Sequence, residues 1–227
     1  MKFDILTIFP DILDSYINKG MIRIAQEKKI VKIKTHNLRD WAVDKHGTVD
    51  DRPYGGGPGQ ILMVEPVYRA LKKIAPDVRA QKLVPIRRRI ILLSARGKKW
   101  DQQMAKKFSQ KYDQLIFVCP RYEGHDERIR KFVDEEISIG DYILTGGELG
   151  AMVIMDSVTR LLPGVLGKKE SLNEESHSRP GYLEYPQYSR PEIFTVKTKK
   201  YRVPKILLTG HHENIRKWRE KNSKQKI

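Results

Sequence analysis

The sequence has little cysteine and no long apolar run, and both absences narrow its class. The only cysteine, Cys119, excludes an internal disulfide framework and a zinc site built from several cysteines. The apolar runs, such as residues 90–93, are far shorter than a membrane span. The N-terminal stretch MKFDILTIFPDILDSY contains acidic residues and no small-residue cleavage site, which excludes a signal peptide. We therefore expect a cytoplasmic protein with no membrane partner.

Positive charge is in excess and is unevenly distributed. The 227 residues carry a formal net charge of +16. Residues 72–107 hold twelve basic and two acidic side chains and residues 196–227 hold eleven and two, whereas residues 108–195 hold ten and fifteen. Two basic blocks around an acidic middle favour a polyanion-binding surface beside a site that bears carboxylates. A basic protein with solvated Lys and Arg faces has the same composition, so composition alone leaves nucleic-acid binding open.

Short apolar runs alternate with helical patterns, which predicts an α/β domain with a mostly parallel sheet. Buried strands are expected at residues 3–9, 30–34, 90–93, 115–119 and 142–144. Helices are expected at residues 10–20, 65–74, 100–111, 125–135 and 146–161. Residues 163–181 are rich in Gly and Pro and have the composition of a linker or mobile loop. A small basic unit follows, with a helix expected over residues 211–224.

Three segments with glycines and polar residues lie at or near the ends of predicted strands. They are LSARG at 93–97, RYEGHDERI at 121–129 and IGDYILTGGEL at 139–149. Open α/β sheets bind ligands at the carboxyl edge of their strands, so the three segments together favour a site there, although any one of them could be an ordinary turn.

The segment DDRPYGGGPG at 50–59 also contains many glycines. It lacks the Lys-Ser/Thr of a P-loop and does not join a strand to a helix, so it is no nucleotide-binding fingerprint. Its glycines allow close approach to the backbone, although a flexible surface turn has the same composition.

These motifs carry a resemblance to a known family. RYEGHDERI, DDRPYGGGPG and SIGDYILTGGELGAMVIMDSVTRLLPGVLG resemble segments of the bacterial tRNA (guanine-N1)-methyltransferases of the SPOUT superfamily. EYPQYSRP and VPKILLTGHHENIRKWR extend the resemblance to about residue 220. It implies methylation of N1 of the guanosine at position 37 of tRNA, just 3′ of the anticodon, with S-adenosyl-L-methionine as donor. It also implies a SPOUT-type parallel sheet with a deep trefoil knot, a small mainly helical C-terminal domain, and a homodimer with its active site at the subunit interface.

The resemblance further implies three parts of the chain. Residues 1–161 would form the knotted catalytic domain that binds S-adenosylmethionine, and residues 162–180 a mobile linker. Residues 181–227 would form a basic tRNA-binding domain. Because the family usually continues with more helix after the motif WRE, this last domain is expected to be shortened.

The chemistry of the implied reaction requires a base and a cation. Guanine N1 carries a proton that must leave, and negative charge then shifts toward O6. Counted from VTRLLPGVLG, the resemblance implies Glu175 as the base, where the family has Asp, and Arg160 as the cation. Glu174 competes for the role, and both acids would otherwise be solvated linker residues. Glu123 is a further catalytic candidate, assisting transfer or helping to hold the Mg²⁺ that the family uses; an ion pair with an arginine of its own motif is the alternative.

The resemblance places the cofactor in the three loops and the substrate beside them. The implied cofactor residues are Leu93, Ser94, Ala95, Pro120, Tyr122, Glu123, Gly124, Ile139, Gly140, Asp141, Tyr142, Ile143, Leu144, Gly146, Gly147 and Gly150. Three of these, Ala95, Pro120 and Gly150, differ from the residues usual in the family and are expected to alter loop stiffness. The implied substrate-binding residues are Asp50, Arg52, Gly59 and Glu184, and the set of metal ligands is left open beyond the possible role of Glu123.

Two other functions remain open at this point. One is a catalytically weak RNA-binding protein on the same scaffold, which would have the same charge pattern. The other is a ribose 2′-O-methyltransferase of the same superfamily, which the segments DDRPYGGGPG and EYPQYSRP disfavour because they resemble the guanine-N1 enzymes alone.

Overall fold

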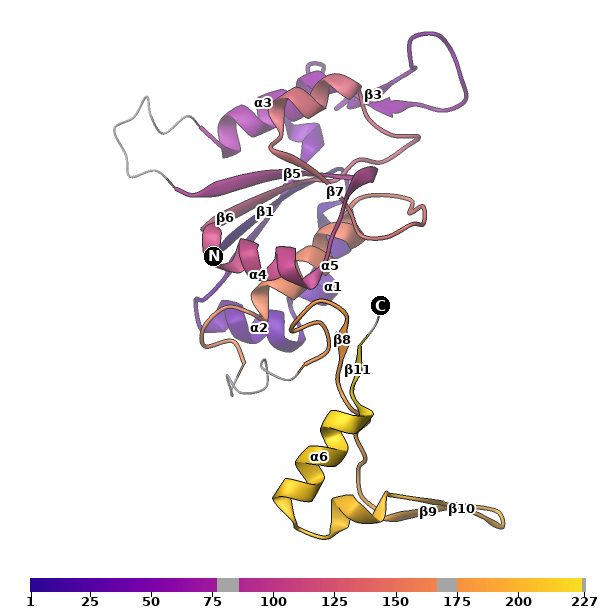
Figure 1. Ribbon diagram of the computed structural model, residues 1–227. Coiled ribbons are helices and arrows are strands. Elements are labelled where there is room, and N and C mark those ends of the chain that lie inside the picture. Colours follow the sequence, from indigo (N-terminus) through magenta and orange to yellow (C-terminus); the bar gives the residue numbers. More distant parts are fainter. Residues whose placement is uncertain (77–85, 167–174, 226–227) are drawn as a thin grey trace. The chain divides into compact units, whose positions relative to one another are not determined.

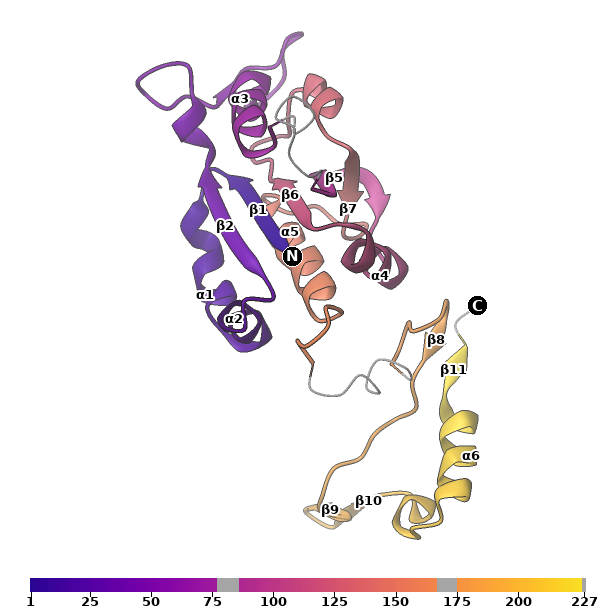
Figure 2. The same ribbon diagram turned by 90° about the vertical axis from the view of Figure 1, so that its left-hand side faces the viewer.

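Five parallel strands form one sheet in the N-terminal part of the chain. The computed structural model of the protein describes residues 1–76, 86–166 and 175–225. The strands are β1 (Lys2–Thr7), β2 (Lys32–Asn37), β5 (Arg88–Lys99), β6 (Gln114–Val118) and β7 (Glu135–Ser138). Their order in the sheet is β2-β1-β6-β5-β7, and each neighbouring pair runs parallel (Figure 2). The α/β class with a parallel sheet is therefore confirmed.

Helices cover both faces of this sheet (Figure 1). One face carries η1 (Pro10–Leu13), α1 (Asp14–Ile17), α2 (Gly20–Glu27), α4 (Gln102–Lys111) and α5 (Glu148–Thr159). The other carries η2 (Leu38–Trp41), α3 (Val64–Ile74) and η4 (Glu127–Phe132). Successive side chains of a strand point to opposite faces, so in β1 Phe3 and Ile5 join the first core and Leu6 joins the second.

Two of the predicted elements differ in the structure. Residues 142–144 form a loop in place of a strand, and 84% of the surface of Ile143 is exposed. The fifth strand is β7, which begins with two glutamates and so carries little strand signal in the sequence. Ion pairs with Arg89 and Arg130 accommodate these carboxylates at the sheet edge. The helix predicted at 125–135 is shorter, with only the 3-10 helix η4.

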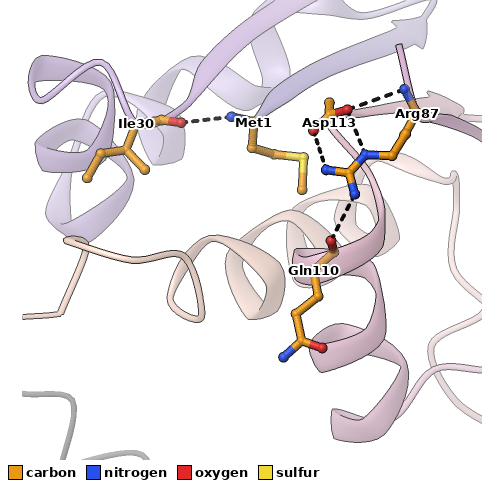
Figure 3. A network of polar contacts seen from close by, with 5 residues as sticks. All are labelled: Met1, Ile30, Arg87, Gln110 and Asp113. Carbon is orange, nitrogen blue, oxygen red and sulfur yellow. Dashed lines mark hydrogen bonds and ion pairs between the residues drawn. The ribbon is translucent and has the colours of Figure 1, made fainter. Parts of the chain in front are cut away.

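A bidentate ion pair joins the amino ends of β5 and β6 (Figure 3). Arg87 places Nε 3.0 Å and Nη2 2.8 Å from the two carboxylate oxygens of Asp113. Its Nη1 donates to the Gln110 carbonyl at 3.5 Å, and the Met1 amine beside it donates to the Ile30 carbonyl at 2.9 Å. The hydrogen bonds from Arg87 lower the pKa of Asp113. Arg87, which belongs to the basic block at residues 72–107, is thus engaged in an ion pair within the fold.

The described residues divide into two units, Met1–Gly167 and Lys168–Ile227, and the second is small and largely exposed. Its elements are β8 (Tyr182–Leu183), β9 (Ile193–Val196), β10 (Lys199–Arg202), η6 (Lys205–Leu208), α6 (His212–Asn222) and β11 (Lys224–Gln225). β8 pairs with β11 and β9 with β10, both antiparallel. Trp218 of α6 lies 6.4 Å from Tyr188 between ring centroids. The middle of the predicted linker, residues 167–174 with Glu174, lies outside the described residues.

The described helices are all too short or too polar to cross a membrane.

Candidate active site

A cavity of about 400 Å³ opens where β5, β6 and β7 present their carboxyl-side loops. Its walls come mainly from residues 93–96, 120–125 and 137–147. Every residue that the sequence placed at the cofactor lines this cavity except Asp141, whose carboxylate pairs with Lys99. The cavity size lies in the range of small-molecule sites, and its lining mixes apolar side chains with polar and backbone groups. The three loops therefore converge on a single binding space.

An interruption in β5 forms one wall of the cavity. The pairing of β5 with β7 is broken between Leu93 and Lys98, and both residues lie opposite Ile137. Residues 94–97 loop out of the ladder between these two anchor points. At Gly97 an added Cβ would lie 2.4 Å from the backbone nitrogen of Ile137, so only glycine fits this closing point. The loop is thereby fixed at both ends.

A buried ion pair ties the second and third loops together. Arg121, after β6, places Nε 3.0 Å from Oε2 of Glu148, whose side chain is 1% exposed at the start of α5. The hydroxyl of Thr7, at the end of β1, donates to Oε1 of the same carboxylate at 2.6 Å. At Gly146 an added Cβ would lie 2.3 Å from Nε of Arg121, which explains the glycine there. The guanidinium also lies 5.0 Å from the ring centroid of Phe9.

The glycine-rich segment 50–59 reaches the cavity through the residues that follow it. The Glu123 amide donates to the Gln60 carbonyl, and the Leu62 amide donates to the Gly124 carbonyl, both at 3.0 Å. β3 (Asp50–Asp51) pairs with β4 (Ile61–Leu62), which closes the segment into a loop. The ends of the glycine-rich loop are therefore held against the second cofactor loop.

Two of the predicted substrate residues touch that cofactor loop directly. The Tyr122 hydroxyl hydrogen-bonds the carboxylate of Asp50, and burial together with this bond raises the pKa of Tyr122. At Gly59 an added Cβ would lie 2.5 Å from Cγ of Glu123. The third residue, Arg52, is exposed, and its amide donates to the carboxylate of Asp51. The structure thus brings Asp50 and Gly59 to the rim of the cavity.

The catalytic candidates are divided between the two units. Arg160 is half-buried and ends α5, with its amide donating to the Asp156 carbonyl at 3.1 Å. Glu123 is exposed and lines the cavity. Glu175 belongs to the second unit, where it is half-buried and its carbonyl accepts from the Ser178 amide at 3.0 Å.

Glu184, the remaining substrate candidate, also lies in the second unit, where its amide donates to Ser176 Oγ at 3.0 Å. An ion pair with an arginine of its own motif was the expected alternative for Glu123. Both arginines of that motif pair with other carboxylates. Arg121 pairs with Glu148, as described above, and Arg128 pairs with Asp126.

Several residues of the cavity were missed in the sequence. Arg96, Arg121, His125 and Glu127 all contribute to its lining. His125 is half-buried, and burial lowers its pKa below the ordinary value of 6.5. Its position directly after Gly124 in RYEGHDERI was the signal that could have found it, because its neighbours in the motif were assigned to the cofactor.

The described residues contain no group of three or more His, Cys, Asp or Glu side chains arranged to hold a metal ion. Glu123 is therefore not part of a preformed cluster of metal ligands within the described residues. Mg²⁺ often binds through one or two carboxylates together with substrate and water, but the side chains here do not supply its ligand set.

Comparison with known proteins assigns the family. The family tRNA (Guanine-1)-methyltransferase TrmD matches residues 1–227. A tRNA (guanine-N(1)-)-methyltransferase of Desulfitobacterium hafniense is 48% identical over 98% of this chain and 80% of its own length. Those of Clostridium tetani and Dictyoglomus turgidum are 49% and 46% identical, covering 98% and 100% of this chain and 87% and 86% of their own. The chain therefore belongs to the tRNA (Guanine-1)-methyltransferase TrmD family.

Proposed function

We propose that this protein transfers the methyl group of S-adenosyl-L-methionine to N1 of the guanosine at position 37 of tRNA. The observation that carries the proposal is the meeting of the three predicted cofactor loops around one cavity, with the glycine-rich loop docked on its rim. The family match over the whole chain supports the same reaction.

The cavity suits S-adenosylmethionine in size and in lining. The side chains of Leu93, Ile139 and Leu144 offer apolar walls for the adenine ring, and the glycines at 146, 147 and 150 allow tight packing of the backbone around it. Arg96 and Glu123 supply one charge of each sign for the carboxylate and the ammonium of the methionine portion. When bound, the cofactor would supply an electrophilic methyl group on a sulfonium.

The residues of the chain would then handle the proton and the developing charge. The carboxylate of Glu175 accepts the N1 proton, and the freed N1 electron pair forms the new bond to the methyl carbon. The cofactor would supply the methyl group by cleavage of its carbon–sulfur bond and would keep the bonding electrons as a neutral thioether. The guanidinium of Arg160 stabilises the negative charge that shifts to O6 of the base.

The glycine-rich loop is proposed to hold the target base. A base inside a stacked loop must be turned out to reach a methyl donor in a cavity. Asp50 and Arg52 can hydrogen-bond the donor and acceptor edges of guanine, and Glu184 is the further substrate contact. Gly59 leaves room for Glu123 beside that base, because an added Cβ would collide with Glu123.

Two finer features of the family belong to the proposal. The first is the SPOUT-type trefoil knot of the catalytic unit. The second is a homodimer with its active site at the interface, which an exposed apolar patch near the cavity supports. That patch comprises side chains of η1, α1 and α5 and the residue before η1, each more than 40% exposed: Phe9, Ile12, Tyr16, Leu149 and Val153. Exposed apolar side chains gathered on a few elements are typical of an interaction surface.

The test is identification of the product. The full-length protein is incubated with labelled S-adenosylmethionine and unmodified tRNA carrying guanosines at positions 36 and 37, and the digested nucleosides are separated. We expect label in N1-methylguanosine, lost when position 37 is changed to adenosine. Label in a 2′-O-methylated nucleoside, or tRNA binding without any transfer, would contradict the proposal.

A further inference from the structure

One ring nitrogen of His125, in the wall of the cavity, has no hydrogen-bond partner. The residue lines the cavity, and its Nε2 atom is buried without a hydrogen bond to any described residue. An unpaired polar atom that is buried costs free energy, so nearly all such atoms in proteins have a partner. A polar group of a ligand in the cavity can supply the partner of Nε2.

The fold fixes the backbone of His125 and thereby the place of its ring. The Leu62 amide donates to the Gly124 carbonyl at 3.0 Å, and the Asp126 amide donates to the Leu62 carbonyl at 2.9 Å. These two bonds enclose His125 and form its parallel bridge with Leu62. The last torsion of a histidine side chain has a broad, roughly two-fold energy profile. The ring can therefore turn its Nε2 edge toward a ligand without any change in the backbone.

The imidazole of His125 is neutral near pH 7 and carries one N–H donor. Burial lowers its pKa, the cations of Arg96 and Arg130 add to this effect, and the carboxylates of Glu127 and Glu136 oppose it. Both carboxylates are paired with Arg130: Nη1 lies 2.6 Å from Oε1 of Glu127, and Nε lies 3.0 Å from Oε2 of Glu136. The charges around the ring are thus largely compensated, except that of Arg96.

The loop that interrupts β5 adds two further donors to this side of the cavity. Arg96 lines the cavity and forms no ion pair within residues 1–76, 86–166 and 175–225. The Ser94 hydroxyl lines the cavity as well and accepts from the Arg96 amide at 3.2 Å, so its own proton is left to donate. A guanidinium, a hydroxyl and an imidazole N–H are donors suited to a carboxylate.

We propose that His125 is a ligand-binding residue that donates from Nε2 to a carboxylate of the ligand in the cavity, next to Arg96. In S-adenosylmethionine this is the carboxylate of the methionine portion, and the inference rests on the proposed function in taking that ligand. The ammonium group of the same portion does not suit this position, because Arg96 repels it. His125 adds a directed hydrogen bond to the charge attraction that Arg96 supplies.

Three substitutions of His125 distinguish its two ring nitrogens. Gln places an amide nitrogen near the position of Nε2, Asn places one near Nδ1, and Leu keeps apolar bulk without a donor. These variants of the full-length protein, with Arg96→Gln, are titrated by calorimetry with S-adenosylmethionine and with its decarboxylated form. The second ligand keeps the adenosine, the sulfonium and the ammonium and lacks only the carboxylate. His46→Gln, at an exposed histidine, is the control, and urea unfolding verifies that each variant is folded.

We expect His125→Leu and His125→Asn to weaken binding of S-adenosylmethionine roughly ten- to a hundredfold, the effect of losing one hydrogen bond to a charged group. Their affinity for the decarboxylated ligand should equal that of the parent protein. Arg96→Gln should show the same selective loss, whereas His125→Gln and His46→Gln should bind both ligands like the parent.

Equal losses for the two ligands in the Leu and Asn variants would mean that His125 only shapes the cavity, which overturns the proposal. Unchanged affinity for S-adenosylmethionine in these variants overturns it as well. If His125→Leu does not fold, His125→Asn and Arg96→Gln decide the question: a preference for the carboxylate as strong as the parent's in both would contradict the contact.

Methyl transfer to tRNA separates this inference from the proposed function. Transfer to guanosine 37 by the parent, without a selective loss in the variants, refutes the His125 contact and leaves the proposed function standing. A selective loss of S-adenosylmethionine binding, in a protein that transfers no methyl group to guanosine N1, refutes the proposed function and leaves the contact standing. A parent protein that binds neither ligand refutes both.

Discussion

Arg121 and Glu148, 27 residues apart in the chain, form a buried ion pair between two loops of the cavity, with Nε 3.0 Å from Oε2. Arg121 contributes to the lining of the cavity, whereas Glu148 does not. Its carboxylate is shared with the Thr7 hydroxyl, so three strand ends of the sheet are joined at one point. The shape of the cavity therefore depends on a carboxylate that lies behind its wall.

Glu148→Gln should destabilise the protein and weaken cofactor binding together. It leaves the Arg121 guanidinium, largely buried, without its counter-charge, which costs about 3 kcal/mol in the free energy of unfolding. Urea unfolding measures this loss, and calorimetry with S-adenosylmethionine measures the affinity. The control is Glu65→Gln, which breaks the exposed pair with Arg69 and should cost less than about 1 kcal/mol. If both variants lose the same free energy of unfolding and the same cofactor affinity, the buried pair does not hold the cavity in shape.

Gly59→Ala tests the contact between the glycine-rich loop and the cavity. Its Cβ would lie 2.5 Å from Cγ of Glu123, so the variant should displace that side chain and slow methyl transfer about tenfold or more, as a misplacement near reacting groups does. Gly56→Ala is the matched control, because it has a similar positive φ, +80° against +75°, but no heavy atom within 4 Å. The backbone strain is thereby shared and only the collision differs. If both variants slow transfer equally, strain alone accounts for the effect.

The proposed base is tested by its charge. Glu175→Gln keeps size and hydrogen bonding but removes basicity, so transfer in single-turnover assays should fall by roughly two to four powers of ten. Cofactor and tRNA affinities should change little. Glu175→Asp should retain substantial activity, because it keeps a carboxylate base and shortens it by one methylene.

Glu174→Gln is the control for the assignment of the base to Glu175 and should leave the rate of methyl transfer nearly unchanged. Loss of transfer in Glu174→Gln together with normal transfer in Glu175→Gln would mean that the assignment is off by one residue. If neither change matters, the base lies elsewhere, and Glu184→Gln is the next variant to assay.

His125 makes stability depend on pH near neutrality. Burial lowers its folded-state pKa below 6.5; the carboxylates of Glu127 and Glu136 oppose the shift, and the cations of Arg96 and Arg130 add to it. The unfolded chain therefore binds more protons as pH falls below 6.5, and this contribution to stability is lost between that pH and the folded-state pKa.

Urea midpoints at pH 7.5 and 5.5 should differ less in His125→Gln than in the parent protein. His46→Gln, at an exposed histidine, should keep the parent's difference. An unaltered pH dependence in His125→Gln would assign the effect to other groups.

The first basic block divides into paired and unpaired charges, which changes its expected contribution to tRNA binding. Arg87 pairs with Asp113, Arg88 donates to the Pro76 carbonyl, and Arg89 pairs with Glu135. Neutralising these three should lower the unfolding midpoint more than it lowers the salt dependence of tRNA binding. Neutralising the exposed Lys106 and Lys107 of α4 should do the reverse. If only the arginine variant shows a reduced dependence of tRNA affinity on salt, the three arginines contact tRNA and the two lysines do not.

The parts of the fold that follow local rules could be predicted from the sequence. Strand β6 contains the apolar run LIFV, β1 is apolar apart from Lys2, Asp4 and Thr7, and α3 buries Val67, Ala70 and Leu71 at helical spacing. The loop at 142–144 was read as a strand because its side chains are apolar, yet they line a cavity. Sequence pattern cannot tell a residue that faces a ligand space from one that faces a core.

The site could be predicted only as far as its motifs were contiguous. The three loops could be expected to meet because each motif carries several lining residues of the cavity in a row. The partner of Arg121 was not found, since Glu148 meets it only after the chain has passed through β7. The motif position of His125 could have indicated the residue, but its lowered pKa could not be predicted, because burial is a property of the fold.

The broken ladder between β5 and β7 has a consequence for the entropy of ligand binding. Residues 94–97 lie between two pairings on the same residue, Ile137, so the loop ends cannot separate. A ligand that enters the cavity meets a wall that is already ordered and gives up little conformational freedom there. A residue inserted between Leu93 and Lys98 would have to be taken up within this loop, because a shift of Lys98 and Lys99 by one position in register would turn their side chains to the opposite face of the sheet.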